Sequence, residues 1–168
     1  MVTYVQPAEL LEELSDDPLP QAPADYHSAE ANIREVPSHD EEEHRRTVLV
    51  IEDDHDFRRM LVASLKLRFG YHVLYATDGL AGIRMVAREQ PDLILMDLAM
   101  PGMDGLTTTR LLKRDPSTAH IPVVAFSNYG RVSTWQRMAL DAGCARCFDK
   151  SLRLQELYEA IEALLELN

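Results

Sequence analysis

The sequence predicts an α/β fold in which helices cover both faces of a parallel β-sheet. Short apolar runs rich in β-branched residues recur along residues 46–168, and segments with helical periodicity separate them. This alternation is typical of parallel sheets, because each return of the chain to the sheet needs a crossover helix. The 168 residues are enough for one domain of ordinary size with its own core.

The strands are predicted from the apolar runs and the helices from spacing and end signals. The strands are expected at 48–51, 71–76, 93–96, 123–126 and 147–149. The helices are expected at 56–68, 80–89, 106–114, 131–142 and 154–167. Gly70 and Gly143 follow two of these helices as C-terminal stops, and Asp115-Pro116 ends another. Five strands and five helices suit a flavodoxin-like doubly wound sheet with strand order 2-1-3-4-5.

The acidic balance of the chain is concentrated in its first 45 residues. They hold 12 Asp or Glu and 2 Arg, whereas the remainder holds 16 acidic and 15 basic residues. Prolines are scattered through the same stretch, so residues 1–45 are expected to form a largely disordered acidic arm. Within it, residues 7–14 are either a frayed terminus or a short amphipathic docking segment. The single folded domain is expected at 46–168.

The sequence shows neither a basic face nor a long apolar segment, and this bears on the expected partners and location. No basic face or added recognition helix is visible, so direct binding to nucleic acid is not expected. No run of 18 apolar residues occurs, and the N-terminus lacks a basic region followed by an apolar stretch. We therefore expect no membrane insertion and a cytoplasmic location.

Polar residues follow four of the predicted strands, and together they indicate a site. Glu52 and Asp53 follow the first strand, Asp97 the third, Ser127 the fourth and Lys150 the fifth. The ends of parallel strands meet at one edge of the sheet, where α/β proteins bind ligands. Taken singly, each residue is explained by a helix cap, a turn or a surface lysine. The set in this order is not explained by four unrelated structural roles.

The chemistry of the set favours phosphoryl transfer. The carboxylates of Glu52, Asp53 and Asp97 are hard oxygen ligands of the kind that Mg²⁺ prefers. Asp97 stands alone after the central strand and is the best candidate nucleophile for an aspartyl-phosphate. Lys150 and the hydroxyl of Ser127 can pair with phosphoryl oxygens.

Residues 46–168 resemble the receiver domain of two-component response regulators. The resemblance is carried by VLVIEDDHDFRRML at 48–61, PDLILMDLAMPGMDG at 91–105, IPVVAFSN at 121–128 and DAGCARCFDKS at 141–151. It implies that Asp97 is the phosphoacceptor, that Asp53 binds the metal directly and that Glu52 acts through water. It also implies that Ala99 lends its backbone carbonyl to the metal, and that Ser127 and Lys150 are the switch hydroxyl and the site lysine of the family.

The sequence departs from the family pattern at three positions. Ser151 replaces the usual Pro after the lysine, Cys147 replaces an aromatic residue three positions before it, and Asn128 replaces a small residue after the hydroxyl. Cys144 and Cys147 have the spacing of a redox or half-zinc motif. Because the pair leads into a strand and no second pair exists, we expect buried packing cysteines.

The expected function is that of a stand-alone signalling module. It accepts a phosphoryl group on Asp97 from a histidine kinase or phosphotransfer protein, depends on Mg²⁺, and acts through contacts with a downstream protein target. It is not expected to be a turnover enzyme. One alternative is a receiver-like scaffold that works without phosphorylation. Another is an aspartyl-phosphate phosphatase, although the haloacid-dehalogenase-like type needs a second Asp where Ala99 stands.

Overall fold

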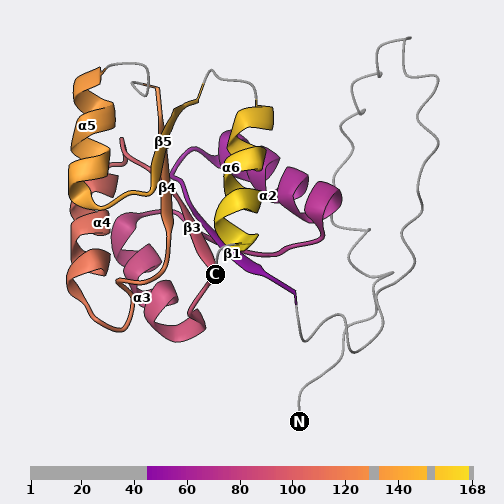
Figure 1. The fold of residues 1–168 in the computed structure, drawn as a ribbon, viewed down its shortest axis with the longest axis horizontal. Helices are drawn as coiled ribbons and strands as arrows, with labels where there is room; N and C mark the ends of the chain where they lie inside the picture. Colours follow the sequence, from indigo (N-terminus) through magenta and orange to yellow (C-terminus); the bar gives the residue numbers. More distant parts are fainter. Residues whose placement is uncertain (1–44, 129–132, 151–153, 167–168) are drawn as a thin grey trace, which may run out of the picture. The chain divides into compact units, whose positions relative to one another are not determined.

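A computed structural model describes residues 45–128, 133–150 and 154–166. Five parallel strands form one sheet in the order β2-β1-β3-β4-β5, as predicted (Figure 1). The strands are β1 Thr47–Ile51, β2 His72–Ala76, β3 Leu93–Asp97, β4 Val123–Ser127 and β5 Arg146–Asp149. The helices are α2 His55–Phe69, α3 Gly79–Glu89, α4 Gly105–Arg114, α5 Ser133–Ala142 and α6 Leu154–Glu166. Four parts of the sequence-based predictions lie outside the described residues: residues 1–44 of the acidic arm, 131–132 of the fourth helix, residue 167 of the fifth helix, and Ser151.

The register of the sheet brings the ends of four strands to one edge. Ile51 pairs with Met96, and Asp97 pairs with Phe126 on the next strand. Ser127 in turn pairs with Asp149. The residues that end these strands, or directly follow them, therefore lie at the same carboxyl edge of the sheet.

Local signals set where the helices begin and end. Three helices begin after an Asp whose side chain accepts a hydrogen bond from the backbone N–H three residues later; these caps are Asp54, Asp78 and Asp104. The cap at Asp54 explains why α2 begins at His55. At its other end Gly70 has a left-handed φ of 69°, which glycine adopts without a steric cost.

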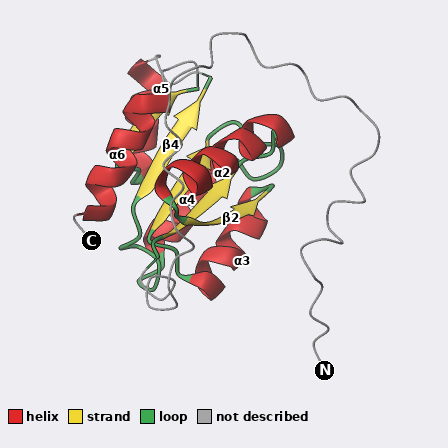
Figure 2. Ribbon diagram, turned by 90° about the vertical axis from the view of Figure 1, so that its right-hand side faces the viewer, coloured by secondary structure: helices red, strands yellow, loops and turns green. Residues whose placement is uncertain are grey.

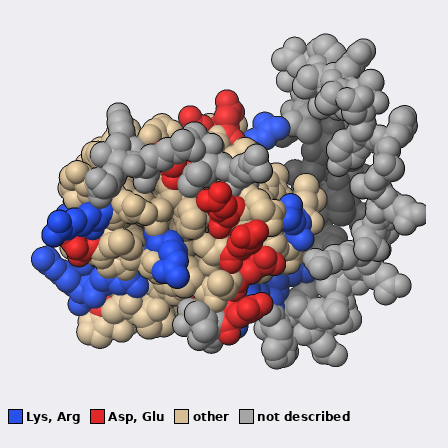
Figure 3. Space-filling view, turned by 45° about the horizontal axis from the view of Figure 1, so that its top comes forward, with Lys and Arg blue, Asp and Glu red and all other residues tan. Residues whose placement is uncertain are grey.

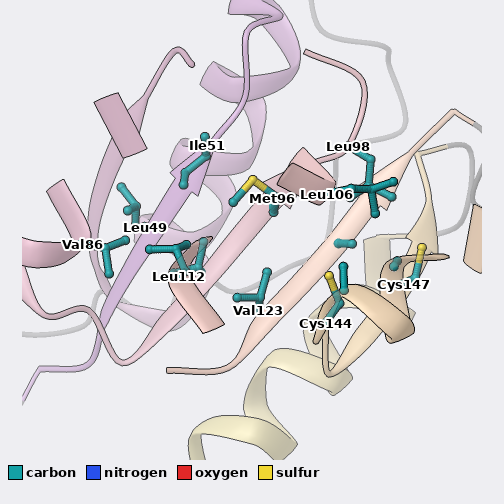
Figure 4. Close-up of a cluster of buried hydrophobic side chains, with 14 of the residues drawn as sticks. Leu49, Ile51, Val86, Met96, Leu98, Leu106, Leu112, Val123, Cys144 and Cys147 are labelled. Atoms are coloured by element: carbon teal, nitrogen blue, oxygen red, sulfur yellow. The ribbon is translucent and has the colours of Figure 1, made fainter. Parts of the chain in front are cut away.

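Two hydrophobic clusters lie on opposite faces of the sheet, because alternate strand residues point to opposite sides. One cluster joins the sheet to α3, α4 and α5, and the other joins it to α2 and α6. Figure 1 shows these two groups of helices on the two sides of the strands, and Figure 2 shows the same layers turned by 90°. In Figure 4, side chains from β1, α3, β3, α4 and β4 converge in the first cluster.

The two cysteines belong to the first cluster. Cys144 and Cys147 are both buried and unbonded to each other, and Figure 4 places them beside the end of that cluster. Burial raises the pKa of the Cys144 thiol to about 11, so it is not a thiolate at neutral pH. The prediction of packing cysteines is confirmed.

The surface of the described domain carries both signs of charge. In Figure 3, Asp and Glu side chains form a band across the visible face, and Lys and Arg lie on both sides of it. None of the described helices is long and apolar enough to cross a membrane.

Candidate functional site

The predicted site residues meet at the carboxyl edge of the sheet. Glu52 directly follows β1, with Asp53 beside it, and Asp97 ends β3 at the centre of the sheet. Ser127 ends β4, and Lys150 directly follows β5. The fold therefore gathers residues from four separate segments into one place, as the positions of the strand ends predict.

Three carboxylates form a compact acidic cluster. One oxygen from each of Glu52, Asp53 and Asp97 can be chosen so that all three lie within 4.8 Å of one another. Glu52 is fully buried and Asp97 is 2% exposed, whereas Asp53 is open to solvent. Buried carboxylates at such a separation repel each other, so a cation is needed among them.

The ammonium of Lys150 is one such cation. Its Nζ donates hydrogen bonds to Glu52 Oε1 at 3.0 Å and to Asp97 Oδ2 at 2.9 Å. It also lies 2.7 Å from Glu52 Oε2, but that oxygen is not aligned for a hydrogen bond, so the contact is ionic only. The Lys150 side chain is 12% exposed, and the pairs that it makes are therefore largely shielded from water.

Burial and neighbouring charges change the acidity of this group of residues. Burial raises the pKa of Glu52 from 4.5 to about 7, and the nearby Asp97 carboxylate adds to the shift, while the contact with Lys150 opposes it. Burial alone would lower the pKa of Lys150, but its hydrogen bonds to Glu52 and Asp97 outweigh burial and raise it. The lysine is thus charged at neutral pH, and Glu52 keeps its proton to a higher pH than an ordinary glutamate does.

The backbone around Asp97 fixes its carboxylate. Oδ1 accepts a hydrogen bond from the backbone N–H of Ala99 at 3.0 Å, while Oδ2 accepts from Lys150. Gly105 begins α4 directly against this loop, and its N–H donates to the carbonyl of Leu98 at 3.2 Å. A Cβ on Gly105 would lie 2.8 Å from Leu98 Cα and nearer still to the carbonyl oxygen of Asp97. Only glycine allows this close approach.

Two predicted roles stay predictions. Ser127 is fully buried at the end of β4, and its carbonyl accepts a hydrogen bond from the backbone N–H of Lys150 at 3.0 Å. This bond ties the end of β4 to the site lysine, but it does not involve the hydroxyl that the sequence singles out. Ala99 is exposed, and its backbone N–H donates to Asp97, but the role of its carbonyl toward a metal stays a prediction.

Sequence reasoning missed Arg58, which braces the acidic loop. Its Nη1 donates to the carbonyl oxygens of Glu52 at 2.7 Å and Asp53 at 3.1 Å. Its guanidinium also lies 5.6 Å from the centre of the Tyr75 ring on β2. An arginine in the first turns of a helix has no distinctive sequence signal, because such residues are usually solvated.

Sequence reasoning also missed two aromatic rings that lie beside Lys150. The Nζ atom lies 4.9 Å from the ring centre of Phe57 and 5.4 Å from that of Phe126. Apolar spacing places both residues toward the core, but it does not indicate which side chain their rings contact.

The cluster fits a hard divalent cation. Its three carboxylates exceed the single charge of Lys150, and the exposed Asp53 gives solvent access to the cluster. Oxygen ligands of this kind suit Mg²⁺ or Ca²⁺ better than soft transition metals. The residues that could hold the ion are Asp53 and Asp97, with Glu52 behind them.

Comparisons with known proteins find relatives among response regulators. Response regulator PleD of Caulobacter vibrioides is 49% identical over 77 residues, which make up 46% of this chain and 17% of PleD. Polar-differentiation response regulator DivK of Brucella anthropi is 29% identical over 120 residues, which make up 71% of this chain and 96% of DivK. The chain thus spans a small part of PleD and nearly all of DivK.

A solved structure shows the same fold. The signal receiver domain of the DNA binding response regulator protein (merR) from Colwellia psychrerythraea 34H aligns with a TM-score of 0.66 and 31% identity. The alignment covers 72% of this chain and 98% of that one. The family described as "Response regulator receiver domain" matches residues 48–162, which are most of the chain. The chain therefore belongs to the response regulator receiver domain family of two-component systems.

Proposed function

We propose that the chain is a phosphorylation-controlled signalling module that accepts a phosphoryl group on Asp97. One observation carries the proposal. The Asp97 carboxylate ends the central strand almost completely buried, and it lies between a second acid, Glu52, and the ammonium of Lys150 that bonds both. A structural carboxylate does not need this surrounding, whereas a nucleophile that must hold a phosphoryl group does.

The donor is a phosphohistidine of a histidine kinase or of a phosphotransfer protein. An oxygen of Asp97 attacks phosphorus, the P–N bond of the donor breaks, and the leaving imidazole takes up a proton. Lys150 then exchanges its contact with Asp97 for one with a phosphoryl oxygen, and Ser127 is the second group proposed to respond to that oxygen. Bound between Asp53 and Asp97, Mg²⁺ would supply positive charge against the phosphoryl oxygens.

The output is a change in contacts with a separate protein target. DivK supports this proposal, because this chain spans 96% of a response regulator that has little length beyond such a domain. The chain catalyses its own phosphotransfer and self-dephosphorylation, and it does not turn over a small-molecule substrate. Both partners are proteins of a two-component pathway.

The test is intact-mass measurement after incubation with Mg²⁺ and phosphoramidate, a small donor with a P–N bond. The wild type should gain one phosphoryl group, and Asp97→Asn should gain none. Asp104→Asn is the matched control, because Asp104 lies in the same loop but caps α4, a role that Asn also fills. EDTA should abolish the gain.

Each alternative gives a different result. A phosphorylation-independent scaffold would take up no phosphoryl group with any donor. An aspartyl-phosphate phosphatase would release phosphate from p-nitrophenyl phosphate over many turnovers. A mass gain that survives in Asp97→Asn would show that another residue is the acceptor.

A further inference from the structure

The ammonium of Lys150 lies beside two adjacent aromatic rings as well as between two carboxylates. Its distances to the ring centres, 4.9 Å for Phe57 and 5.4 Å for Phe126, are within the range of cation–π attraction. The two rings touch each other at a centroid separation of 5.7 Å, tilted by 41°. They form a continuous aromatic wall along the ammonium.

Both rings are held by the backbone elements that build the site. Phe126 is 1% exposed within β4 and pairs with Asp97 in the sheet register. Phe57 lies in the first turn of α2, where its N–H donates to the capping carboxylate of Asp54 at 2.8 Å. Phe57 is half-buried, so its ring is the more solvent-exposed of the two rings beside the ammonium.

A ring and a carboxylate hold an ammonium in different ways. A carboxylate accepts N–H hydrogen bonds and must be exchanged when a phosphoryl oxygen arrives. A ring attracts the charge through its π face and requires no N–H donor, so its contact can persist through that exchange. Packing against the two rings also restricts the rotamers of the lysine, which lowers the entropy lost when it binds the phosphoryl group.

We propose that Phe57 is a positioning residue that holds the Lys150 ammonium in place, against Phe126, while its carboxylate contacts are exchanged for a phosphoryl oxygen. The inference rests on the proposed function, because it assigns a role within phosphoryl transfer to Asp97. Because the role depends on an aromatic ring, a tyrosine at position 57 should preserve it and a leucine should not.

The geometric half of the proposal is testable without a phosphodonor. The methylene protons next to Nζ should be shifted upfield by the ring currents of both rings, and NMR of lysine-labelled protein measures this shift. Lys150→Arg identifies the signal. Phe57→Leu should move the signal toward the position of ordinary lysines, and Phe57→Tyr should leave it in place.

The effect of Phe57 on the reaction is tested by the rate of phosphorylation with phosphoramidate at saturating Mg²⁺. Phe57→Leu should slow the rate constant of phosphorylation about three- to tenfold, the size expected from losing one partly desolvated cation–π contact. Phe57→Tyr should restore the wild-type rate. The concentration of Mg²⁺ for half-maximal rate should change little in either variant, because Phe57 does not face the metal with a ligand atom.

Phe69→Leu is the matched control. Phe69 lies in the same helix, packs against Tyr71 and Tyr158, and has the guanidinium of Arg68 at 5.6 Å from its ring centre, all at the end of α2 away from the site. Its loss should lower the unfolding temperature and leave the phosphorylation rate unchanged.

The outcomes separate the inference from the proposed function. A wild type that takes up no phosphoryl group overturns the proposed function, while the NMR shift still decides whether the rings hold Lys150. If the wild type is phosphorylated and Phe57→Leu reacts as fast, or if Phe57→Tyr is as slow as Phe57→Leu, the positioning role of Phe57 is wrong. If Phe69→Leu is slowed as much as Phe57→Leu, the slowing comes from general destabilisation, and the positioning role of Phe57 is wrong in that case too.

Discussion

Replacing Gly105 with Ala tests how closely α4 must approach the acceptor. The new Cβ would lie 2.8 Å from Leu98 Cα and closer to the carbonyl oxygen of Asp97, and both are backbone atoms that cannot rotate away. Forcing a methyl group into such a space costs about 1–3 kcal/mol. The better helix propensity of Ala offsets at most about 1 kcal/mol. The net loss is therefore at most about 3 kcal/mol, and we expect about 1–2 kcal/mol, the middle of the range.

The loss of stability and the disturbance of the site can be measured separately. By thermal unfolding, Gly105→Ala should melt roughly 4–8 °C below the wild type. Its phosphorylation rate with phosphoramidate should fall at least about tenfold, because a displacement on the order of 1 Å at the reacting group can cost about 100-fold. The rate is measured well below the melting temperature, so that unfolding does not contribute.

Gly102→Ala is the control for this experiment. Gly102 has a φ of 76°, which an alanine adopts at a cost of about 1–2 kcal/mol, but a Cβ there would have no atom within 4 Å. The two variants should therefore melt at similar temperatures, and only Gly105→Ala should be slow. A Gly105→Ala protein as stable and as reactive as the wild type would refute the close-approach argument.

Three further predictions concern the charges of the site and the lifetime of the phosphorylated state. Lys150→Met leaves two buried carboxylates without their ammonium, so urea unfolding at pH 8 should show a loss of about 3 kcal/mol, and a loss below 1 kcal/mol would contradict the buried pairing. Because the pKa of Glu52 is raised to about 7 in the folded protein, its contribution to stability is complete below pH 4.5 and is lost as the pH rises through 7. In metal-free urea unfolding, the free energy of unfolding of Glu52→Gln should therefore rise relative to that of the wild type as the pH increases from 4.5 to 7. A difference between the two proteins that does not change with pH would show that the pKa of Glu52 is not raised. Finally, the methyl group of Ala99, exposed beside Asp97, cannot hydrogen-bond an attacking water, so Ala99→Asn should shorten the lifetime of the aspartyl-phosphate followed by intact mass; equal lifetimes would contradict this reasoning.

The sheet and the acidic site were predictable because both depend on short-range patterns. Runs such as 93–96 are apolar throughout, as strands buried on both faces must be. Parallel strands bring their ends together, which places Glu52, Asp97 and Lys150 at one edge without any further information. The ends of the elements were less predictable: β5 begins at Arg146 rather than Cys147, since strand pairing with Val124 extends it.

The surroundings of the lysine were not predictable from spacing. Phe57 and Phe126 come from a helix and a strand that are far apart in the sequence, and their rings meet only through tertiary packing. The helix α2 also exposes apolar residues, including Leu67 at 86%, so an apolar side chain on a helix is not by itself a sign of burial. Side-chain direction across elements decides such contacts, and no local pattern encodes it.

The bond between Lys150 and Glu52 joins residues 98 positions apart, across a sheet in which β3 and β4 separate their strands. During synthesis, β1 leaves the ribosome long before β5, so the acidic cluster exists at first without its ammonium. Contacts of such long range form late in folding, because the loop that they close is large. The acceptor site is thus completed only when the last strand docks, and a nascent or incompletely folded chain cannot hold a phosphoryl group in this way. Competence to receive a signal is therefore tied to completion of the fold.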